Sequence, residues 1–129
     1  MKKTMADYIS EAAVAVTENL QKGEALTKPL VEEFVKKDYK TIWIVASGSS
    51  YNGSLCARDF VREYLKVEVK IIPPATFNAF ENNFGEDDFV FVVSQTGYST
   101  NALESLNILR GKGVKVIGVT GNVKSDFKG

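Results

Sequence analysis

The sequence predicts an α/β fold: a three-layer α-β-α sandwich around a parallel sheet, with strands in the flavodoxin-like order 2-1-3-4 and two helices in front of it. Two observations lead to this prediction. Runs of β-branched and aromatic residues alternate with amphipathic segments, as in βαβ units, and these runs span 41–46, 66–72, 88–93 and 114–120. The first run has no polar alternation, which is typical of a strand that helices cover on both faces.

Apolar residues at helical spacing predict two helices within residues 1–38. The first spans about residues 4–21 and ends near Gly23, and the second begins at Thr27, a favourable N-cap residue. Pro29 is tolerated in the first turn of that second helix. The α/β core then spans residues 39–129, and the 129 residues together fit one domain.

The remaining elements follow in chain order. The run at 66–72 shows some alternation, as expected nearer the edge of a sheet, and two prolines end it. A short helix is expected around 77–81. The helix after the first strand carries Cys56, Phe60 and Tyr64 on one apolar stripe, which we expect to face the core, with Ala57, Val61 and Leu65 beside it. The last nine residues show no helix or strand pattern.

Composition excludes several classes of function. Lysine plus arginine balance aspartate plus glutamate at 16 each, so nothing favours nucleic acid or an anionic membrane as a partner. The single cysteine and the absence of histidine make a metal site unexpected, and no cofactor is indicated. We therefore expect a cytoplasmic protein without a transmembrane segment or signal peptide.

The candidate site lies in two loops rich in hydroxyl groups and small residues, 46–54 and 94–100. In the 2-1-3-4 order these loops follow neighbouring strands at the switch point, where open parallel sheets bind ligands. Each loop leads into a helix N-terminus, whose unpaired amides and positive dipole suit a phosphate group without help from lysine or arginine. The alternative is that the same residues only cap their helices. The candidate binding residues are Gly48, Ser49, Ser50, Ser94, Gln95, Thr96, Gly97 and Ser99. A weaker third contributor is 119–122, after the fourth strand.

At these loops the chain resembles the sugar isomerase (SIS) domain family. Ala-Ser-Gly-Ser-Ser-Tyr-Asn-Gly resembles the family's first hydroxyl-rich loop, and Val-Val-Ser-Gln-Thr-Gly-Tyr-Ser-Thr resembles its Ser-Gln-Ser-Gly-x-(Ser/Thr) loop. The resemblance implies phosphosugar binding, and it is strongest to the isomerase half of glucosamine-6-phosphate synthase and to fructosamine-6-phosphate deglycases. Tyr98 stands where the synthases usually carry glutamate, and the synthases' glutaminase half with its N-terminal cysteine is absent from this sequence. Both departures favour a deglycase or an ammonia-independent isomerase.

The family also implies features that this sequence lacks. Its enzymes usually carry two such domains and a fifth strand, and their catalytic residues lie in the later half or in a neighbouring subunit. We therefore expect the N-terminal half of a longer enzyme, an isomerase, aminotransferase or deglycase acting on a ketose or ketosamine 6-phosphate. We expect this chain to contain no catalytic residues, to be inactive alone and to form a homo-oligomer such as a dimer.

Two alternatives remain open from the sequence. One is a non-enzymatic sugar-phosphate sensor. The other is a flavodoxin-like FMN carrier, which is less favoured because the phosphate loop of flavodoxins follows the first strand, whereas here the comparable loop follows the third.

Overall fold

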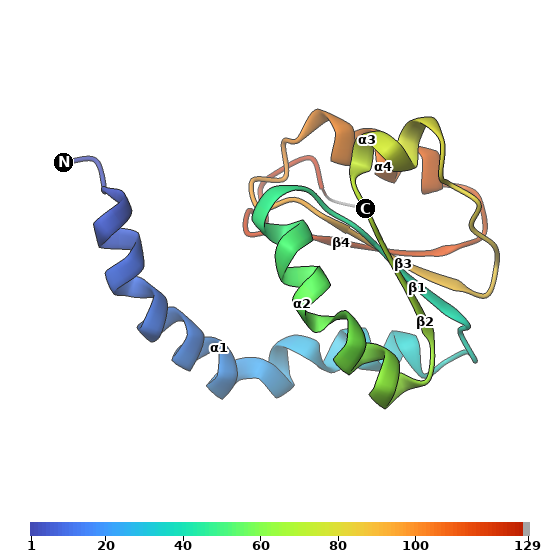
Figure 1. Cartoon of the computed structure of the whole chain (residues 1–129), viewed down its shortest axis with the longest axis horizontal. Coiled ribbons are helices and arrows are strands. Elements are labelled where there is room, and N and C mark those ends of the chain that lie inside the picture. Colours follow the sequence, from blue (N-terminus) through green and yellow to red (C-terminus); the bar gives the residue numbers. More distant parts are fainter. Residues whose placement is uncertain (128–129) are drawn as a thin grey trace. The chain divides into compact units, whose positions relative to one another are not determined.

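The computed structural model describes residues 1–127, which form two compact units (Figure 1). The first unit comprises Met1–Lys37 and the second begins at Asp38. The elements are α1 (Met5–Phe34), β1 (Thr41–Val45), α2 (Gly48–Leu65), β2 (Glu68–Ile72), α3 (Pro74–Ala79), β3 (Asp88–Val93), α4 (Thr100–Leu109) and β4 (Lys115–Val119).

The first unit contains one continuous helix, α1, where the sequence predicted two. Gly23 does not end the helix, because a glycine inside a helix costs only about 1 kcal/mol. Thr27 does not cap a second helix; its hydroxyl donates to the Gly23 carbonyl at 2.7 Å, four residues back. Pro29 lies inside α1. The N-terminus of α1 has a capping box between Thr4 and Asp7.

The second unit is built on a parallel sheet in the order β2-β1-β3-β4, which confirms the predicted topology. The central strands β1 and β3 bury side chains on both faces, as their continuous apolar runs predicted. Strand β2 alternates exposed and buried residues and forms one edge, also as predicted. Strand β4 forms the other edge, and within residues 1–127 it pairs with β3 alone.

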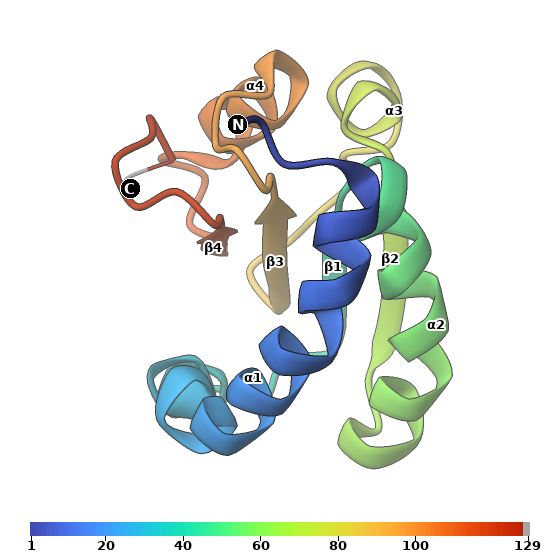
Figure 2. The same ribbon diagram turned by 90° about the vertical axis from the view of Figure 1, so that its left-hand side faces the viewer.

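Helices cover the two faces of the sheet, with α3 and α4 on one face and α2 on the other (Figures 1 and 2). The main core lies under α3 and α4, where Trp43 and Val90 pack against Phe77. Trp43 is 3% exposed, as expected for a core residue, and its indole N–H donates to Asp88 at 3.1 Å. Phe127 completes this core, although the sequence around it showed no pattern of a helix or strand.

The predicted inward stripe of α2 is wrong. Phe60 is 65% exposed and Tyr64 71% exposed, and Cys56 is exposed as well. The residues of α2 that are partly buried are smaller or more polar, and comprise Ser50, Tyr51, Ser54, Arg58 and Val61. Ser54 can lie on this inner side because its hydroxyl donates to the Ser50 carbonyl at 2.8 Å within the helix. The apolar spacing of α2 therefore marks an outer face of this chain.

Within residues 1–127, no helix is both long enough and apolar enough to cross a lipid bilayer.

Candidate functional site

The two candidate loops leave the same edge of the sheet. Strands β1 and β3 are parallel neighbours, and Val45 lies opposite Val92 near their carboxyl ends. The segments that follow, starting at Ser47 and Ser94, therefore emerge side by side in the strand register. Figure 2 shows the β3 arrow pointing toward the edge at which the chain continues into α4. The 2-1-3-4 order on which the sequence-based site depended is thus present in the structure.

The first loop leads into α2 without a side-chain cap. Ser47 occupies the N-cap position, but its hydroxyl makes no capping hydrogen bond. The first backbone bond of the helix runs from the Tyr51 N–H to the Ser47 carbonyl at 3.3 Å. The amides of Gly48, Ser49 and Ser50 precede that bond and have no acceptor within residues 1–127. These three N–H groups lie at the positive end of the helix dipole.

The second loop leads into α4 in the same way. Ser99 is the N-cap residue and its side chain does not cap the helix either. The first backbone hydrogen bond of the helix runs from the Leu103 N–H to the Ser99 carbonyl at 2.9 Å. The amides of residues 100–102 precede it in the chain. Hydroxyl residues at helix starts usually bond to the second or third amide. Neither helix uses its serine for this, so capping does not explain why the serines are there.

Two hydroxyls of the second loop shape the loop itself. Ser94 is 6% exposed, and both its hydroxyl and its carbonyl accept the Gly97 N–H at 3.1 Å. The Thr96 hydroxyl accepts the Tyr98 N–H at 3.2 Å. Each hydroxyl accepts a hydrogen bond here, and within residues 1–127 neither donates one. Gln95 is exposed, and its carbonyl accepts the Gly121 N–H at 3.0 Å.

Gly97 is the one position in the second loop where a side chain has no room. Its φ is +72°, and a Cβ atom there would lie 1.9 Å from the Ser125 hydroxyl oxygen and 2.9 Å from that of Thr120. Ser125 is 3% exposed and donates to the Asn122 carbonyl at 2.7 Å. The glycine is therefore needed to seat the loop after β3 against the loop after β4.

The loop after β4 supports the second loop, a role that the sequence did not indicate. The Asn122 amide donates to the Thr96 carbonyl at 3.3 Å, and the Thr120 hydroxyl lies 3.4 Å from the Gln95 carbonyl. The sequence suggested residues 119–122 only as a weak third contributor to binding. Their cluster of hydroxyl and amide groups was the available signal, but nothing in the sequence showed that they contact residues 95–97.

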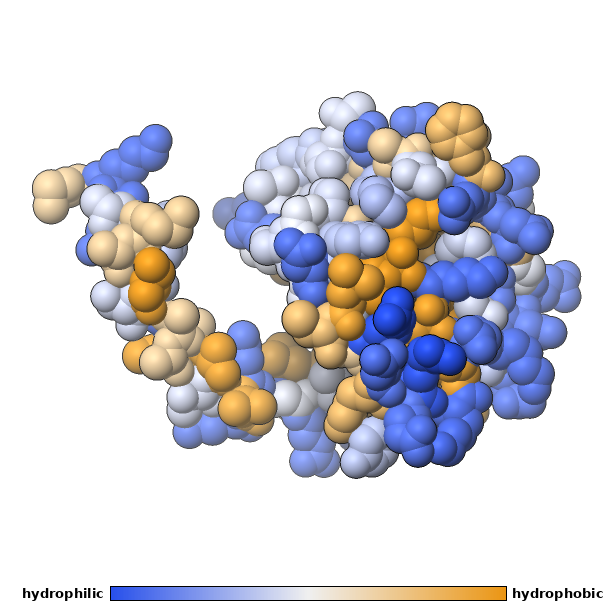
Figure 3. Space-filling model, viewed as in Figure 1, coloured by the Kyte–Doolittle hydropathy of each residue, from blue (hydrophilic) through white to orange (hydrophobic). Residues whose placement is uncertain are grey.

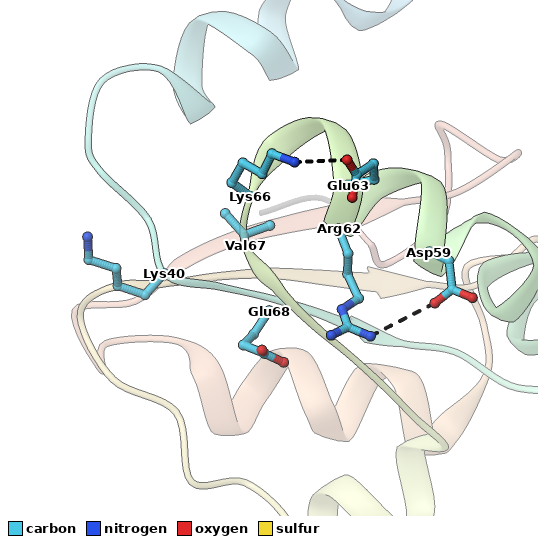
Figure 4. A pocket seen from close by; sticks show the side chains of 7 residues that line it. All are labelled: Lys40, Asp59, Arg62, Glu63, Lys66, Val67 and Glu68. Atoms are coloured by element: carbon cyan, nitrogen blue, oxygen red, sulfur yellow. Dashed lines mark hydrogen bonds and ion pairs between the residues drawn. The ribbon is translucent and has the colours of Figure 1, made fainter.

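A cavity of about 550 Å³ lies at the opposite, amino edge of the sheet (Figure 4). It is lined by Val67 and six charged residues, Lys40, Asp59, Arg62, Glu63, Lys66 and Glu68. Lys66 pairs with Glu63 at 3.0 Å and Arg62 with Asp59 at 3.9 Å. A hydrogen bond to the Asp38 carboxylate, 2.6 Å away, raises the pKa of Lys40. With three cations, three anions and internal pairing, this cavity has no preference for an anion.

The loops contain no lysine, arginine, aspartate or glutamate, so their electrostatic character comes from backbone amides. No cluster of three or more histidine, cysteine or acidic residues in the described part of the chain could hold a metal ion. What this edge of the sheet offers is two uncapped helix N-termini and several hydroxyl groups. That combination can bind an oxyanion through neutral donors.

Comparison with known proteins identifies the family. The profile of the SIS domain matches residues 37–128, so the chain belongs to the SIS domain family.

The curated relatives with similar sequences share one name. The chain is 29% identical over 89 residues to the isomerizing glutamine–fructose-6-phosphate aminotransferase of Chlorobaculum tepidum, covering 69% of this chain and 14% of that protein. It is 25% identical over 124 residues to the enzyme of the same name from Sulfurisphaera tokodaii, covering 94% of this chain and 20% of that protein. The chain thus spans about a seventh to a fifth of the relatives it matches.

Solved structures agree on the fold. A provisionally assigned phosphosugar isomerase from Clostridium difficile 630 superposes with a TM-score of 0.80 at 24% identity, covering 98% of this chain and 35% of that chain. Tagatose-6-phosphate ketose/aldose isomerase from Escherichia coli superposes with a TM-score of 0.67 at 11% identity, covering 86% and 31%. At these identities the likeness concerns the fold.

Proposed function

We propose that this chain is the phosphosugar-binding domain of an enzyme that acts on a ketose or ketosamine 6-phosphate, as an isomerase, aminotransferase or deglycase. The observation that carries the proposal is the pair of uncapped helix N-termini, α2 and α4, which follow adjacent parallel strands. The relatives are named as aminotransferases of fructose 6-phosphate, which supports the same ligand class.

The hydrogen bonds of the two loops suggest which groups bind the ligand and which hold the loops in place. The amides of residues 48–50 and 100–102 bind the phosphate oxygens, and the hydroxyls of Ser49, Ser50 and Ser99 add donors at the rim. Ser94 and Thr96 hold the loop through their acceptor atoms and keep a proton for the ligand. We assign contact with the sugar hydroxyls to the Gln95 side chain, which is exposed. Gly48 and Gly97 allow the backbone to approach the anion.

No catalytic residue is proposed within this chain. The two loops contain no side chain that exchanges a proton near neutral pH, so ring opening and proton transfer require groups from elsewhere in the enzyme. Anchoring the phosphate would orient the distant reacting carbons. We expect this chain to bind ligand and to turn over little or none.

Calorimetry with hydroxyl-deletion variants tests the proposal. Removing one hydroxyl that donates to a charged phosphate should cost about 1.5–3 kcal/mol, or about ten- to a hundredfold in affinity. We expect Thr96→Ala and Ser49→Ala each to weaken binding of fructose 6-phosphate by this factor, with no effect on unphosphorylated fructose, which should bind negligibly. Unchanged affinity in both variants would remove these loops from the site.

A non-enzymatic sugar-phosphate sensor is the second candidate. The absence of acid–base side chains from the loops favours binding without chemistry as much as it favours a split active site. NMR of fructose 6-phosphate incubated with the intact gene product distinguishes the two: isomerised, aminated or cleaved product indicates an enzyme, and bound but unchanged ligand indicates a sensor.

We also propose that copies of the chain associate through α1. No residue of this helix is buried, and large apolar residues recur along it, including Met5, Ile9, Val16, Leu20 and Leu26 (Figure 3). Residues 1–37 carry six lysines and six acidic residues, so a charged surface such as an anionic membrane has no advantage as a partner. A second copy offers a matching apolar stripe without net repulsion.

A further inference from the structure

A short polar network joins α3 to the first turn of α4. The two helices lie side by side (Figures 1 and 2), and Asn78 of α3 faces α4. The Asn78 amide nitrogen donates to the Asn101 carbonyl at 2.9 Å and lies 3.3 Å from a carboxylate oxygen of Glu104. Its amide oxygen accepts the hydroxyl of Ser105 at 2.6 Å. One side chain therefore contacts α4 from its first turn to its second.

Burial explains why this network is ordered. Ser105 is fully buried, with an exposed fraction of 0%, and a buried hydroxyl needs a partner. The Ser105 oxygen also lies 3.0 Å from the Asn101 carbonyl. Since the hydroxyl has one proton and the Asn78 oxygen has none, the 2.6 Å contact requires that proton to point at Asn78. The other end of the Asn78 amide faces the Asn101 carbonyl and the Glu104 carboxylate, which can only accept, so that end must be the nitrogen.

The Asn101 carbonyl belongs to the same peptide unit as the Ala102 N–H. A carbonyl that accepts an additional hydrogen bond polarises its peptide, and the N–H of that peptide becomes a stronger donor. Ala102 is the third residue of α4, where an N-cap side chain usually accepts the amide, but the Ser99 side chain does not do so. Ala102 is 1% exposed, so leaving this N–H without an acceptor is costly unless a ligand supplies one.

We propose that Asn78 is a positioning residue for the phosphate site: by holding the Asn101 carbonyl, it orients the first turn of α4 and strengthens the Ala102 amide as a donor to the ligand. This inference rests on the proposed phosphosugar function. It assigns a role in binding to the α3 segment, which lies outside both hydroxyl-rich loops and which the sequence marked only as a short helix.

Asn82 supplies a matched control. It donates to the carbonyls of Phe77 and Asn78, at 3.0 and 3.3 Å, and so supports the same short helix without a hydrogen bond to α4. Asn78→Ala and Asn82→Ala each remove hydrogen bonds from α3, but only Asn78→Ala removes the side-chain amide that donates to the Asn101 carbonyl. Ser105→Ala is the second test variant, because it removes the hydroxyl that orients Asn78 while leaving α3 unchanged.

The test combines calorimetry with fructose 6-phosphate and the amide proton shift of Ala102 in the ligand-free chain. We expect Asn78→Ala to weaken binding about three- to tenfold and to move the Ala102 resonance upfield, as when one neutral hydrogen bond is lost. Ser105→Ala should act in the same direction by about two- to threefold, and Asn82→Ala should stay within twofold. If Asn78→Ala does not fold, the affinity of Ser105→Ala for fructose 6-phosphate and its Ala102 resonance test the proposal instead.

The failures are distinguishable. If the unmodified chain binds no fructose 6-phosphate, the proposed function fails and the positioning role fails with it. If the unmodified chain binds, but Asn78→Ala and Asn82→Ala weaken binding equally or not at all, only the positioning role is overturned. An unmoved Ala102 resonance in Asn78→Ala would likewise overturn it.

Discussion

Gly97 shows that a residue without a side chain can be essential to the candidate site. Its φ of +72° disfavours other residues, and its Cα faces Ser125 and Thr120 at distances that leave no space for a methyl group. The loop after β3 and the loop after β4 therefore depend on each other. A change at this position should disturb both.

We expect Gly97→Ala to lower the free energy of unfolding by about 2–5 kcal/mol, the sum of left-handed strain and overpacking. Gly111→Ala is the control, because Gly111 has a similar φ of +73° but no atom within 4 Å of the place that a Cβ would occupy. It should cost only the strain, about 1–2 kcal/mol. Urea denaturation measures both, and equal losses in the two variants would show that the packing against Ser125 is unimportant.

At the residue scale, the sequence indicated some residues of the candidate site and not the residues that support it. Hydroxyl and glycine residues directly after apolar strands indicated Ser49, Ser94 and Thr96, because local composition signals a helix start. Asn122 and Ser125 contact Thr96 and Gly97, which lie more than 25 residues earlier in the chain. No sequence periodicity indicates a contact between residues so far apart. The same is true of Asn78 and Ser105.

At the scale of elements, apolar periodicity located the four strands found within residues 1–127, but it misplaced helix boundaries and one helix face. The predicted break at Gly23 is absent, since a single glycine weakens a helix without ending it. In α2 the stripe with Phe60 and Tyr64 is exposed, whereas Val61 on the neighbouring stripe is partly buried. Sequence alone could not decide between them, because an apolar stripe does not reveal whether the sheet or another surface covers it.

The start of α1 gives a prediction of pH dependence. The backbone N–H and the hydroxyl of Thr4 donate to the Asp7 carboxylate at 2.6 and 2.7 Å, and these bonds lower the pKa of Asp7 from its ordinary value of 3.8. A lowered pKa in the folded state means that the stabilisation is present above pH 3.8 and is lost as the pH falls through the folded value.

We therefore expect Asp7→Ala to fray roughly the first turn of α1 at neutral pH, which circular dichroism at the helical band detects. The difference between the variant and the unmodified chain should shrink as the pH falls below 3.8. A difference that stays constant across this range would mean that the ionised carboxylate does not stabilise the helix start.

At the scale of the whole molecule, exposed apolar surface is the main feature that the isolated chain leaves unexplained. Helix α1 has 30 residues and no buried side chain, whereas most helices in proteins owe their stability to the packing of an apolar face. Association of two copies along α1 would cover this surface, which is the basis of the proposed homo-oligomer.

Light scattering at micromolar concentration should give twice the chain mass of 14.2 kDa. Leu20→Glu should convert the dimer to a monomer, because it places a charge on the stripe at a side chain that is 77% exposed and contributes little to folding of one copy. Gln21→Glu adds the same charge to the neighbouring residue and should leave the dimer intact. A monomeric unmodified chain, or equal effects of the two variants, would contradict the proposal.

The measurement that tests the central claim most directly is a titration of the isotope-labelled chain with fructose 6-phosphate, followed through its backbone amide resonances. If the helix starts of α2 and α4 bind one phosphate together, the resonances of residues 48–50 and 100–102 will move and will saturate at the same ligand concentration. Shifts confined to one of these segments, or centred on the charged cavity around Lys40 and Arg62, would contradict it.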